Sequence, residues 1–196
     1  MPTTAAPVDA GRLDATEEAR LWQALGELTD PEIPVVTLRE MGIVRALRRA
    51  ADGQVEVVIT PTYSGCPAMD QIADDIAALL AREGVPGRVV TQLAPAWTTD
   101  WMTPAAHEKL RAYGIAPPRR GATGVTVSTV RFTPKSGATG ASSMRSKGQF
   151  DSQSGIPCPQ CGSVNTTETS PFGSTACKAL YRCLDCLEPF DYFKPL

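Results

Sequence analysis

Four cysteines near the carboxyl end of the chain are spaced for metal binding. They form two Cys-x-x-Cys pairs, Cys158 with Cys161 and Cys183 with Cys186. A gap of two residues lets both sulfurs of a pair face one ion, and Gly162 permits the tight turn that follows the first pair. Two such pairs give closed tetrahedral coordination, so the sequence predicts one structural zinc ion per chain. Iron, an iron–sulfur cluster or two disulfides are the alternatives.

The segment around these pairs has the pattern of a zinc ribbon. A β-rich run, 179–182, lies between the two pairs, and the segment is too small for a large apolar core. Its folding is therefore expected to depend on metal binding, which contributes roughly 10 kcal/mol or more in small zinc peptides. Phe190, Tyr192 and Phe193 fit either a hydrophobic docking edge or the ribbon core. Residues 157–196 carry three basic and four acidic side chains, a balance that disfavours nucleic-acid binding.

A fifth cysteine lies in the amino-terminal half, in Thr60–Pro67, between a strand end and a helix start. Backbone N–H groups of a first helical turn would stabilise a Cys66 thiolate there, which suits a nucleophile or a transient metal ligand. A small buried residue at a helix cap is the equally simple alternative. Asp30 and Glu32 lie among prolines, where they act as turn formers or as carboxylates that help to hold iron.

The sixth cysteine, Cys177, lies between the two pairs. It is interpreted as a small residue packed beside the ribbon, or as an additional ligand or transfer thiol whose pKa Lys178 would lower. His107 is the only histidine, so the chain has no Ser-His-Asp triad, and a packing or solvent-facing role is expected for it.

Composition and charge narrow the class of protein. The chain has 196 residues, 42% hydrophobic and 20% charged, with a formal net charge of −2. These values are typical of a globular protein and provide no overall basic field for nucleic acid or anionic lipid. Residues 1–13 have no apolar run of signal-peptide length, and no stretch is long enough to span a membrane. We therefore expect a cytoplasmic protein with reduced thiols.

The hydrophobic pattern predicts the elements that position these residues. A helix is expected from Asp14 to the Asp30-Pro31 break, then a hairpin of 43–49 and 55–60 around Asp52-Gly53. A second helix follows Pro67 and stops at Gly84, before a strand at 88–93 and a short helix at 103–113. The fold class is α+β: a small two-layer domain of order α-β-β-α-β-α, followed by a zinc-ribbon module. The expected boundaries are a flexible tail at 1–13, the α+β domain at 14–116, a basic Gly/Ser/Pro-rich linker at 117–156 with a strand at 125–132, and the ribbon at 157–196.

Several motifs resemble known families. The small domain shared by iron–sulfur assembly factors of the SufT type is similar to the stretches Asp30–Val36, Met41–Val44, Thr60–Pro67 and Leu93–Met102. The stretches Cys158–Ser163, Phe172–Cys183 and Glu188–Asp191 are similar to the PaaD family, the accessory component of the phenylacetyl-CoA epoxidase system. The resemblance covers about 16–118 and 157–196, and the linker does not match.

This resemblance implies a maturation role and no catalysis by the chain alone. Its client would be the epoxidase, a di-iron oxygenase whose reductase carries an iron–sulfur cluster. Cys66 would be the functional thiol, supported by the acidic motif of Asp30 and Glu32, with iron or a cluster bound transiently. The epoxidase components, above all the reductase, are the expected partners. A homodimer of this chain is a further alternative. The alternatives are a zinc-ribbon module that recruits nucleic acid or a protein complex, and a thiol–disulfide enzyme that uses Cys66 or Cys177.

Overall fold

Two helices build the amino-terminal layer of the computed structural model, which describes residues 13–119 and 155–195. Helix α1 (Ala15–Leu25) begins after Asp14, whose side chain accepts a hydrogen bond from the Thr16 N–H and so caps the helix. Helix α2 (Met69–Arg82) buries Ile72, Ile76 and two leucines along one face, as its helical spacing predicts. It starts two residues after Pro67, so the loop that carries Cys66 precedes the helix.

A three-stranded sheet packs against these helices. Strands β1 (Val44–Arg49) and β2 (Val55–Ile59) pair antiparallel, and β2 pairs in parallel with β3 (Gly87–Thr91). The order is β1-β2-β3, so β2 is central. Its side chains alternate: Val55, Val57 and Ile59 enter the core with the helices, while Glu56 and Val58 face the other side. The expected mixed two-layer arrangement is present.

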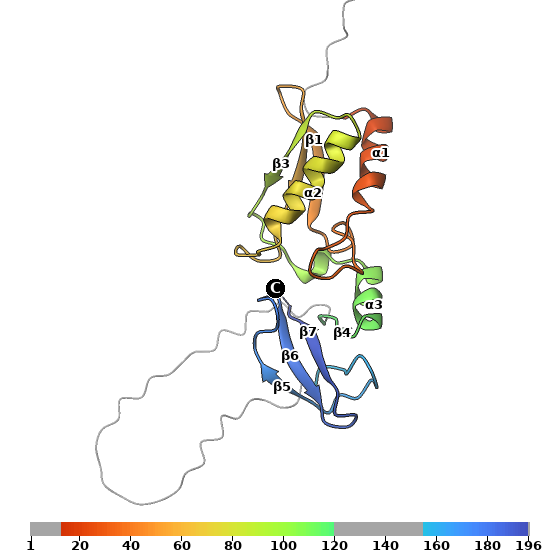
Figure 1. The fold of residues 1–196 in the computed structure, drawn as a ribbon, viewed down its shortest axis with the longest axis vertical. Helices are drawn as coiled ribbons and strands as arrows, with labels where there is room; N and C mark the ends of the chain where they lie inside the picture. The colour runs from red at the N-terminus through yellow and green to blue at the C-terminus, as the bar shows by residue number, and fades with distance from the viewer. Residues whose placement is uncertain (1–12, 120–154, 196) are drawn as a thin grey trace, which may run out of the picture.

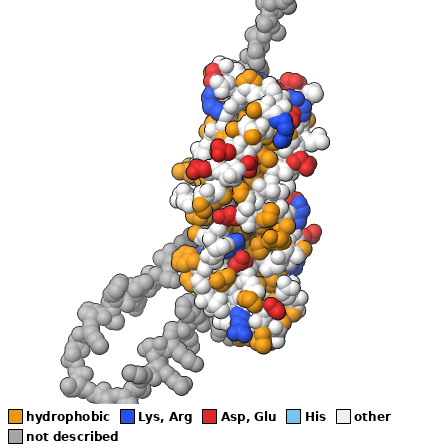
Figure 2. All heavy atoms as spheres, in the orientation of Figure 1, with side chains coloured by type: hydrophobic (Ala, Val, Ile, Leu, Met, Phe, Trp, Pro, Cys, Tyr) orange, Lys and Arg blue, Asp and Glu red, His pale blue; other side chains and the backbone are white. Residues whose placement is uncertain are grey.

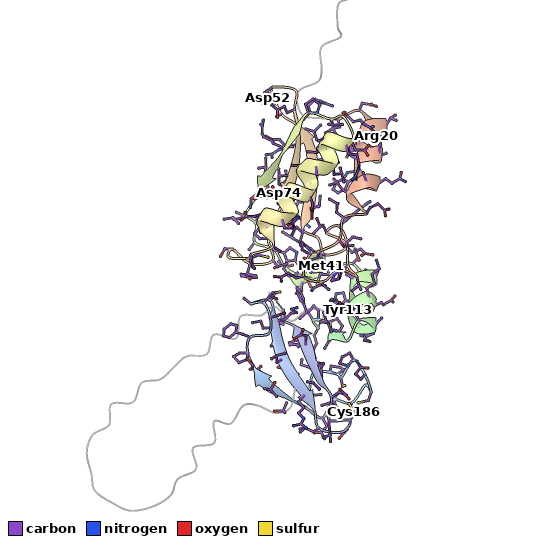
Figure 3. All side chains as sticks on the ribbon, in the orientation of Figure 1. Arg20, Met41, Asp52, Asp74, Tyr113 and Cys186 are labelled. Carbon is purple, nitrogen blue, oxygen red and sulfur yellow. The ribbon has the colours of Figure 1, made fainter. Side chains whose placement is uncertain are left out.

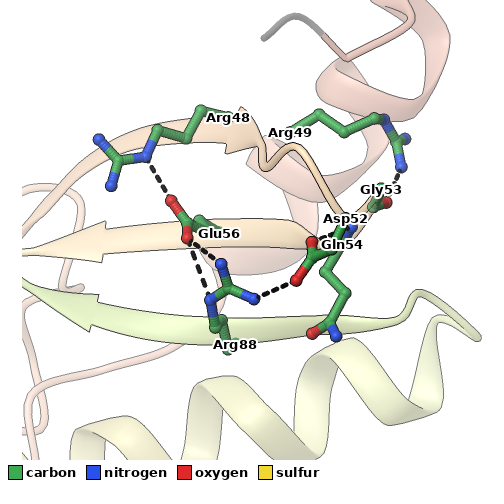
Figure 4. A network of polar contacts seen from close by, with 7 residues as sticks. All are labelled: Arg48, Arg49, Asp52, Gly53, Gln54, Glu56 and Arg88. Carbon is green, nitrogen blue, oxygen red and sulfur yellow. Dashed lines mark hydrogen bonds and ion pairs between the residues drawn. The ribbon is translucent and has the colours of Figure 1, made fainter. Parts of the chain in front are cut away.

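The outer face of this sheet carries an ionic network centred on Glu56 (Figure 4). Arg48 on β1 and Arg88 on β3 are the direct cross-strand partners of Glu56, and both form ion pairs with it. Hydrogen bonds from Arg48 and Arg88 hold the pKa of Glu56 below its usual range. Arg88 also pairs with Asp52 in the hairpin turn. The two arginines neutralise the largely buried Glu56 carboxylate. We therefore interpret this network as stabilising the sheet.

The chain then crosses to the second unit. A 3-10 turn, η1 (Thr99–Trp101), leads into α3 (Pro104–Ala112) and the short strand β4 (Ile115–Ala116). Strands β5 (Thr166–Ser170), β6 (Lys178–Cys183) and β7 (Pro189–Phe193) form an antiparallel ribbon. Strand β4 joins the edge of that ribbon in parallel with β7, giving the order β4-β7-β6-β5.

The two units lie end to end, with α3 beside their junction (Figure 1). Phe193 at the end of β7 and Cys177 just before β6 belong to the same buried cluster as the amino-terminal core. The Phe193 ring meets Trp97 edge-on at 6.0 Å between centroids, and the Trp97 indole N–H donates to the Met41 carbonyl. Figure 3 shows Met41 near this junction and Cys186 at the opposite end of the ribbon.

Some expectations fall outside the described residues. These are the strand at 125–132, most of the 117–156 linker and nearly all of the 1–13 tail. Strand β4 was not expected, because a two-residue run has no detectable periodicity. Among the described residues, none of the helices is long and apolar enough to cross a membrane.

The turn that supports Trp97 provides a test of the core. Gly42 has φ +71°, and an added Cβ would lie 2.8 Å from both the Cβ and the carbonyl oxygen of Trp101. Gly53 has φ +82° with open space around it. We expect Gly53→Ala to cost roughly 1–2 kcal/mol of unfolding free energy from backbone strain alone. Gly42→Ala should cost about 1–3 kcal/mol more, because Trp101 must move. Urea unfolding monitored by tryptophan fluorescence measures both; equal losses would contradict the packing at Gly42.

Candidate metal centre and interdomain thiols

The four ribbon cysteines converge at one point. The sulfurs of Cys158, Cys161, Cys183 and Cys186 all lie within 4.8 Å of one another. The Cys158–Cys186 sulfur distance is 3.7 Å and the Cys161–Cys183 distance is 3.6 Å. Four sulfurs about 2.3 Å from a tetrahedral zinc ion would be ~3.8 Å apart. The geometry therefore fits one metal ion bound by four thiolates, and no disulfide joins any of these cysteines.

Each pair of cysteines lies on a tight turn. In the first turn the Gly162 N–H donates to the Cys158 carbonyl, and Gly162 has φ +76°. In the second turn the Cys183 N–H donates to the Glu188 carbonyl, and Leu187 has φ +67°. Leu187 thus takes the backbone conformation that glycine takes in the first turn. A leucine there is strained, so sequence alone did not mark this position.

One carboxylate joins the two turns. Asp185, between the second pair of cysteines, accepts hydrogen bonds from the Ser163 hydroxyl at 2.5 Å and from the Asn165 amide at 2.7 Å. The Ser163 bond is the main reason that the pKa of Asp185 lies below its usual range. The Leu184 N–H also donates to the Asn165 carbonyl. Sequence reasoning missed Asp185; its position inside a Cys-x-x-Cys pair was the available signal.

The backbone favours a thiolate at Cys183, whereas burial and the neighbouring sulfurs raise the pKa of Cys186 to about 12. The Cys186 N–H donates to the Cys183 sulfur, and this bond is the main cause of a Cys183 pKa of about 7. Thiolates, and not thiols, bind metal. With all four positions filled by sulfur, an ion bound there would have no open coordination site, which is typical of structural sites.

Cys66 lies in the loop between β2 and α2, half-buried against the main core. The Ala68 backbone acts on this sulfur in the direction that lowers the pKa of the Cys66 thiol. Burial is the larger effect, however, and it raises the pKa of the Cys66 thiol. The carboxylates of Glu32 and Asp30 raise it further.

Asp30 and Glu32 come from the loop after α1. The Asp30 side chain accepts from the N–H groups of Glu32 at 2.8 Å and Ile33 at 3.0 Å, so Asp30 does form the turn. It is also buried, and burial raises the pKa of its carboxyl. The acidic motif therefore shapes the loop, and its charge also acts on the Cys66 thiol.

Cys177 lies apart from the four-cysteine centre. It is buried at the junction between the units, where its sulfur contacts the Thr175 hydroxyl at 2.9 Å. Burial raises the pKa of the Cys177 thiol, and the Glu32 carboxylate adds to the effect. Lys178 lowers it, as expected from the sequence, but burial outweighs this contribution. Phe190 and Tyr192, by contrast, are core residues of the ribbon beside its metal-binding cysteines.

The chain is similar to known proteins over both units. Residues 142–194 match the PaaD zinc beta ribbon domain, and residues 18–93 match the iron-sulfur cluster assembly protein family. A protein of Escherichia coli (strain K12), named as a putative 1,2-phenylacetyl-CoA epoxidase component, is 45% identical over 89% of this chain and 90% of its own length. The chain belongs to the PaaD family.

Two further likenesses concern the amino-terminal unit of this PaaD-family chain. An Fe-S protein maturation auxiliary factor of Porphyromonas gingivalis is 33% identical over 45% of this chain and 86% of its own length. A crystal structure of a domain of unknown function, DUF59, from Bacillus anthracis is 24% identical, with a TM-score of 0.44, over 48% of this chain and 92% of that chain. The α+β unit and the ribbon match separate family models, which are joined here in one chain.

Removing one thiol tests the metal centre. Cys161 is exposed, so Cys161→Ser changes a ligand with little effect on packing. We expect this variant to lose the bound ion and the ordered ribbon together, since metal binding supplies roughly 10 kcal/mol or more in modules of this kind. Elemental analysis and near-ultraviolet circular dichroism measure the two losses. Cys177→Ser is the matched control and should keep the ion; full metal content in Cys161→Ser would contradict four-thiol binding.

The raised pKa of Cys66 provides a second test. Its carboxylate neighbours disfavour the thiolate, so Glu32→Gln should lower the Cys66 pKa and speed its alkylation at neutral pH several-fold. The rate is measured with iodoacetamide across pH, with peptide mass spectrometry to identify the modified residue. Glu27→Gln, a change in the preceding segment, should leave the profile unchanged. An identical midpoint in Glu32→Gln and the parent protein would show that the carboxylate does not act on this thiol.

Proposed function

We propose that this chain is an accessory maturation protein of phenylacetate degradation and is not itself an enzyme. Its task is the assembly or repair of the iron–sulfur cluster or di-iron centre of the phenylacetyl-CoA epoxidase complex, in the cytoplasm. An iron–sulfur accessory role in this pathway is supported by the names of two relatives, the epoxidase component and the maturation factor.

The observation that carries the proposal is the surroundings of Cys66. This thiol is half-buried beside a helix start, and the charges of Glu32 and Asp30 raise its pKa, inside the segment that matches the iron–sulfur assembly family. A sulfur with nearby carboxylates suits the transient binding of iron, because thiolate and carboxylate together neutralise a divalent cation. Cys66 would be the transient ligand, and Asp30 and Glu32 would shape its loop and its charge.

The ribbon has a different part in the proposal. Its four cysteines hold one structural zinc ion, whose preference for four thiolates matches the sulfur spacing. Around this metal end, Val164, Leu184 and Leu187 expose about half or more of their surface, at 62%, 49% and 58%. Exposed apolar side chains gathered at one end suit contact with a protein client. We assign this end to docking of an epoxidase component, above all the iron–sulfur reductase.

Recruitment of nucleic acid has less support. On the face shown in Figure 2, basic and acidic side chains are interspersed over both units. The basic stretch that favoured this alternative lies mostly outside the described residues. The thiol–disulfide alternative lacks a Cys-x-x-Cys pair, since both pairs serve the metal centre.

The function is tested by co-expression with the epoxidase components. We expect the reductase to contain several-fold less iron and acid-labile sulfide when the chain is absent or carries Cys66→Ser. Glu27→Gln, which alters a charge in the segment before the acidic motif, should support full cluster content. The proposal fails if cluster content and epoxidase activity are the same in every case.

A further inference from the structure

A cleft lies between α3 and the two chain segments that lead out of β4 and into the ribbon. It has a volume of about 350 Å³, and its lining is formed by Pro104, His107, Glu108, Arg111, Pro117, Pro118, Arg119 and Pro157. This volume is within the range of roughly 300–1,000 Å³ that is typical of small-molecule pockets. We call it the α3 cleft. Its lining includes neither the four metal-binding cysteines nor Cys66.

One wall of the α3 cleft is a single side of α3. Four lining residues repeat at helical spacing and so share that side: Pro104, His107, Glu108 and Arg111. The opposite side of the helix buries Ala106 and Leu110 in the main core, which fixes the helix on the α+β unit. This wall therefore belongs to the α+β unit.

The other wall is rigid and belongs to the ribbon. Pro117 and Pro118 follow β4, which pairs with β7, and Pro157 directly precedes the first metal-binding cysteine. The Arg119 side chain donates to the Gly155 carbonyl and so joins the two segments of this wall. Each proline ring restricts its own backbone, so the wall is preformed. Figure 1 shows α3 and β4 beside the ribbon, where the two walls meet.

Two arginines set the charge of the α3 cleft. Among the described residues, neither Arg111 nor Arg119 forms an ion pair. By contrast, Lys109 in the same last turn of α3 is paired with Glu40 at 2.7 Å. Glu108 is the only carboxylate in the lining, so the two guanidinium groups outnumber it. The α3 cleft is therefore suited to an anion.

A phosphate group fits this lining better than a carboxylate does. A phosphate monoester has close to two negative charges at neutral pH and three acceptor oxygens, so it can accept hydrogen bonds from two guanidinium groups at once. A carboxylate has two oxygens, and one guanidinium group can occupy both. Prolines lie on both walls, and proline rings pack well against flat aromatic rings. The lining therefore favours a phosphate joined to a flat ring.

We propose that the α3 cleft is a binding site for a small phosphorylated molecule with a flat ring, of the class of the nucleoside monophosphates. Arg111 and Arg119 bind its phosphate, and the prolines pack against its ring. Because one wall belongs to the α+β unit and the other to the ribbon, the ligand bridges the two units and stabilises their junction. The site is independent of the proposed maturation role, since it uses neither Cys66 nor a metal ligand.

The test is a calorimetric titration of the full-length, zinc-loaded protein with AMP. We expect one AMP to bind per chain with micromolar affinity and to raise the thermal unfolding midpoint, as a ligand of the folded state does. Adenosine has the ring without the phosphate, and benzoate has a ring with a carboxylate. Both should bind at least tenfold more weakly than AMP, because they lack the phosphate oxygens.

Variants of the lining sharpen this test. Arg111→Gln should weaken AMP binding roughly tenfold to hundredfold, because hydrogen bonds to a charged group are lost. Glu108→Gln should strengthen it several-fold, because it removes a carboxylate that repels the phosphate. Arg82→Gln is the matched control and should bind as the parent does. Like Arg111, Arg82 is an exposed arginine in the last turn of a helix, and it lies outside the α3 cleft.

Three results would overturn the proposed site. The first is the absence of AMP binding at millimolar concentration. The second is an Arg111→Gln variant that is folded, by near-ultraviolet circular dichroism, and binds AMP as tightly as the parent does. The third is equal binding of benzoate or adenosine and AMP, which would show that the phosphate is not what the lining recognises.

Discussion

The convergence of four thiols at the end of the ribbon is the constraint on which much of this structure depends. The ribbon's own buried cluster has few apolar side chains: Ala116, Ile156, Phe190 and Tyr192 beside Cys158 and Cys183. Burial of so few groups offsets only part of the conformational entropy that an ordered sheet loses, so metal–thiolate bonding has to supply the rest. Strand β6 runs from the junction at Lys178 to the metal centre at Cys183. A metal bound at one end would therefore order the residues that contact the α+β unit at the other.

The junction between the two units contains polar and ionisable side chains, whose burial does not by itself stabilise the fold. The Cys177 thiol and the Lys178 ammonium are buried where apolar contact would hold the units together more simply. Burying such groups has an energetic cost unless each finds a partner.

Local patterns accounted for most of the amino-terminal unit. The spacing of Leu21 and Leu25, and of Ile72 and Ile76, predicted both helices, since burial follows the 3.6-residue period. The Asp52-Gly53 turn predicted the hairpin of β1 and β2. The short strand β4 was missed, because it pairs only where the distant β7 provides an edge. Leu187 was missed because a leucine with positive φ contradicts local preference and persists only through its surroundings.

The sequence by itself determined the metal centre, because the two ligands of each pair are neighbours along the chain and their spacing sets the geometry. It also marked Cys66, Asp30 and Glu32 as candidates, through local turns and a helix start. The surroundings of Cys177, in contrast, were decided only by the tertiary structure. Cys177 joins the buried cluster of the α+β unit, which Phe193 also enters through its ring contact with Trp97. Contacts of that kind come from the docking of whole surfaces, which no local spacing encodes.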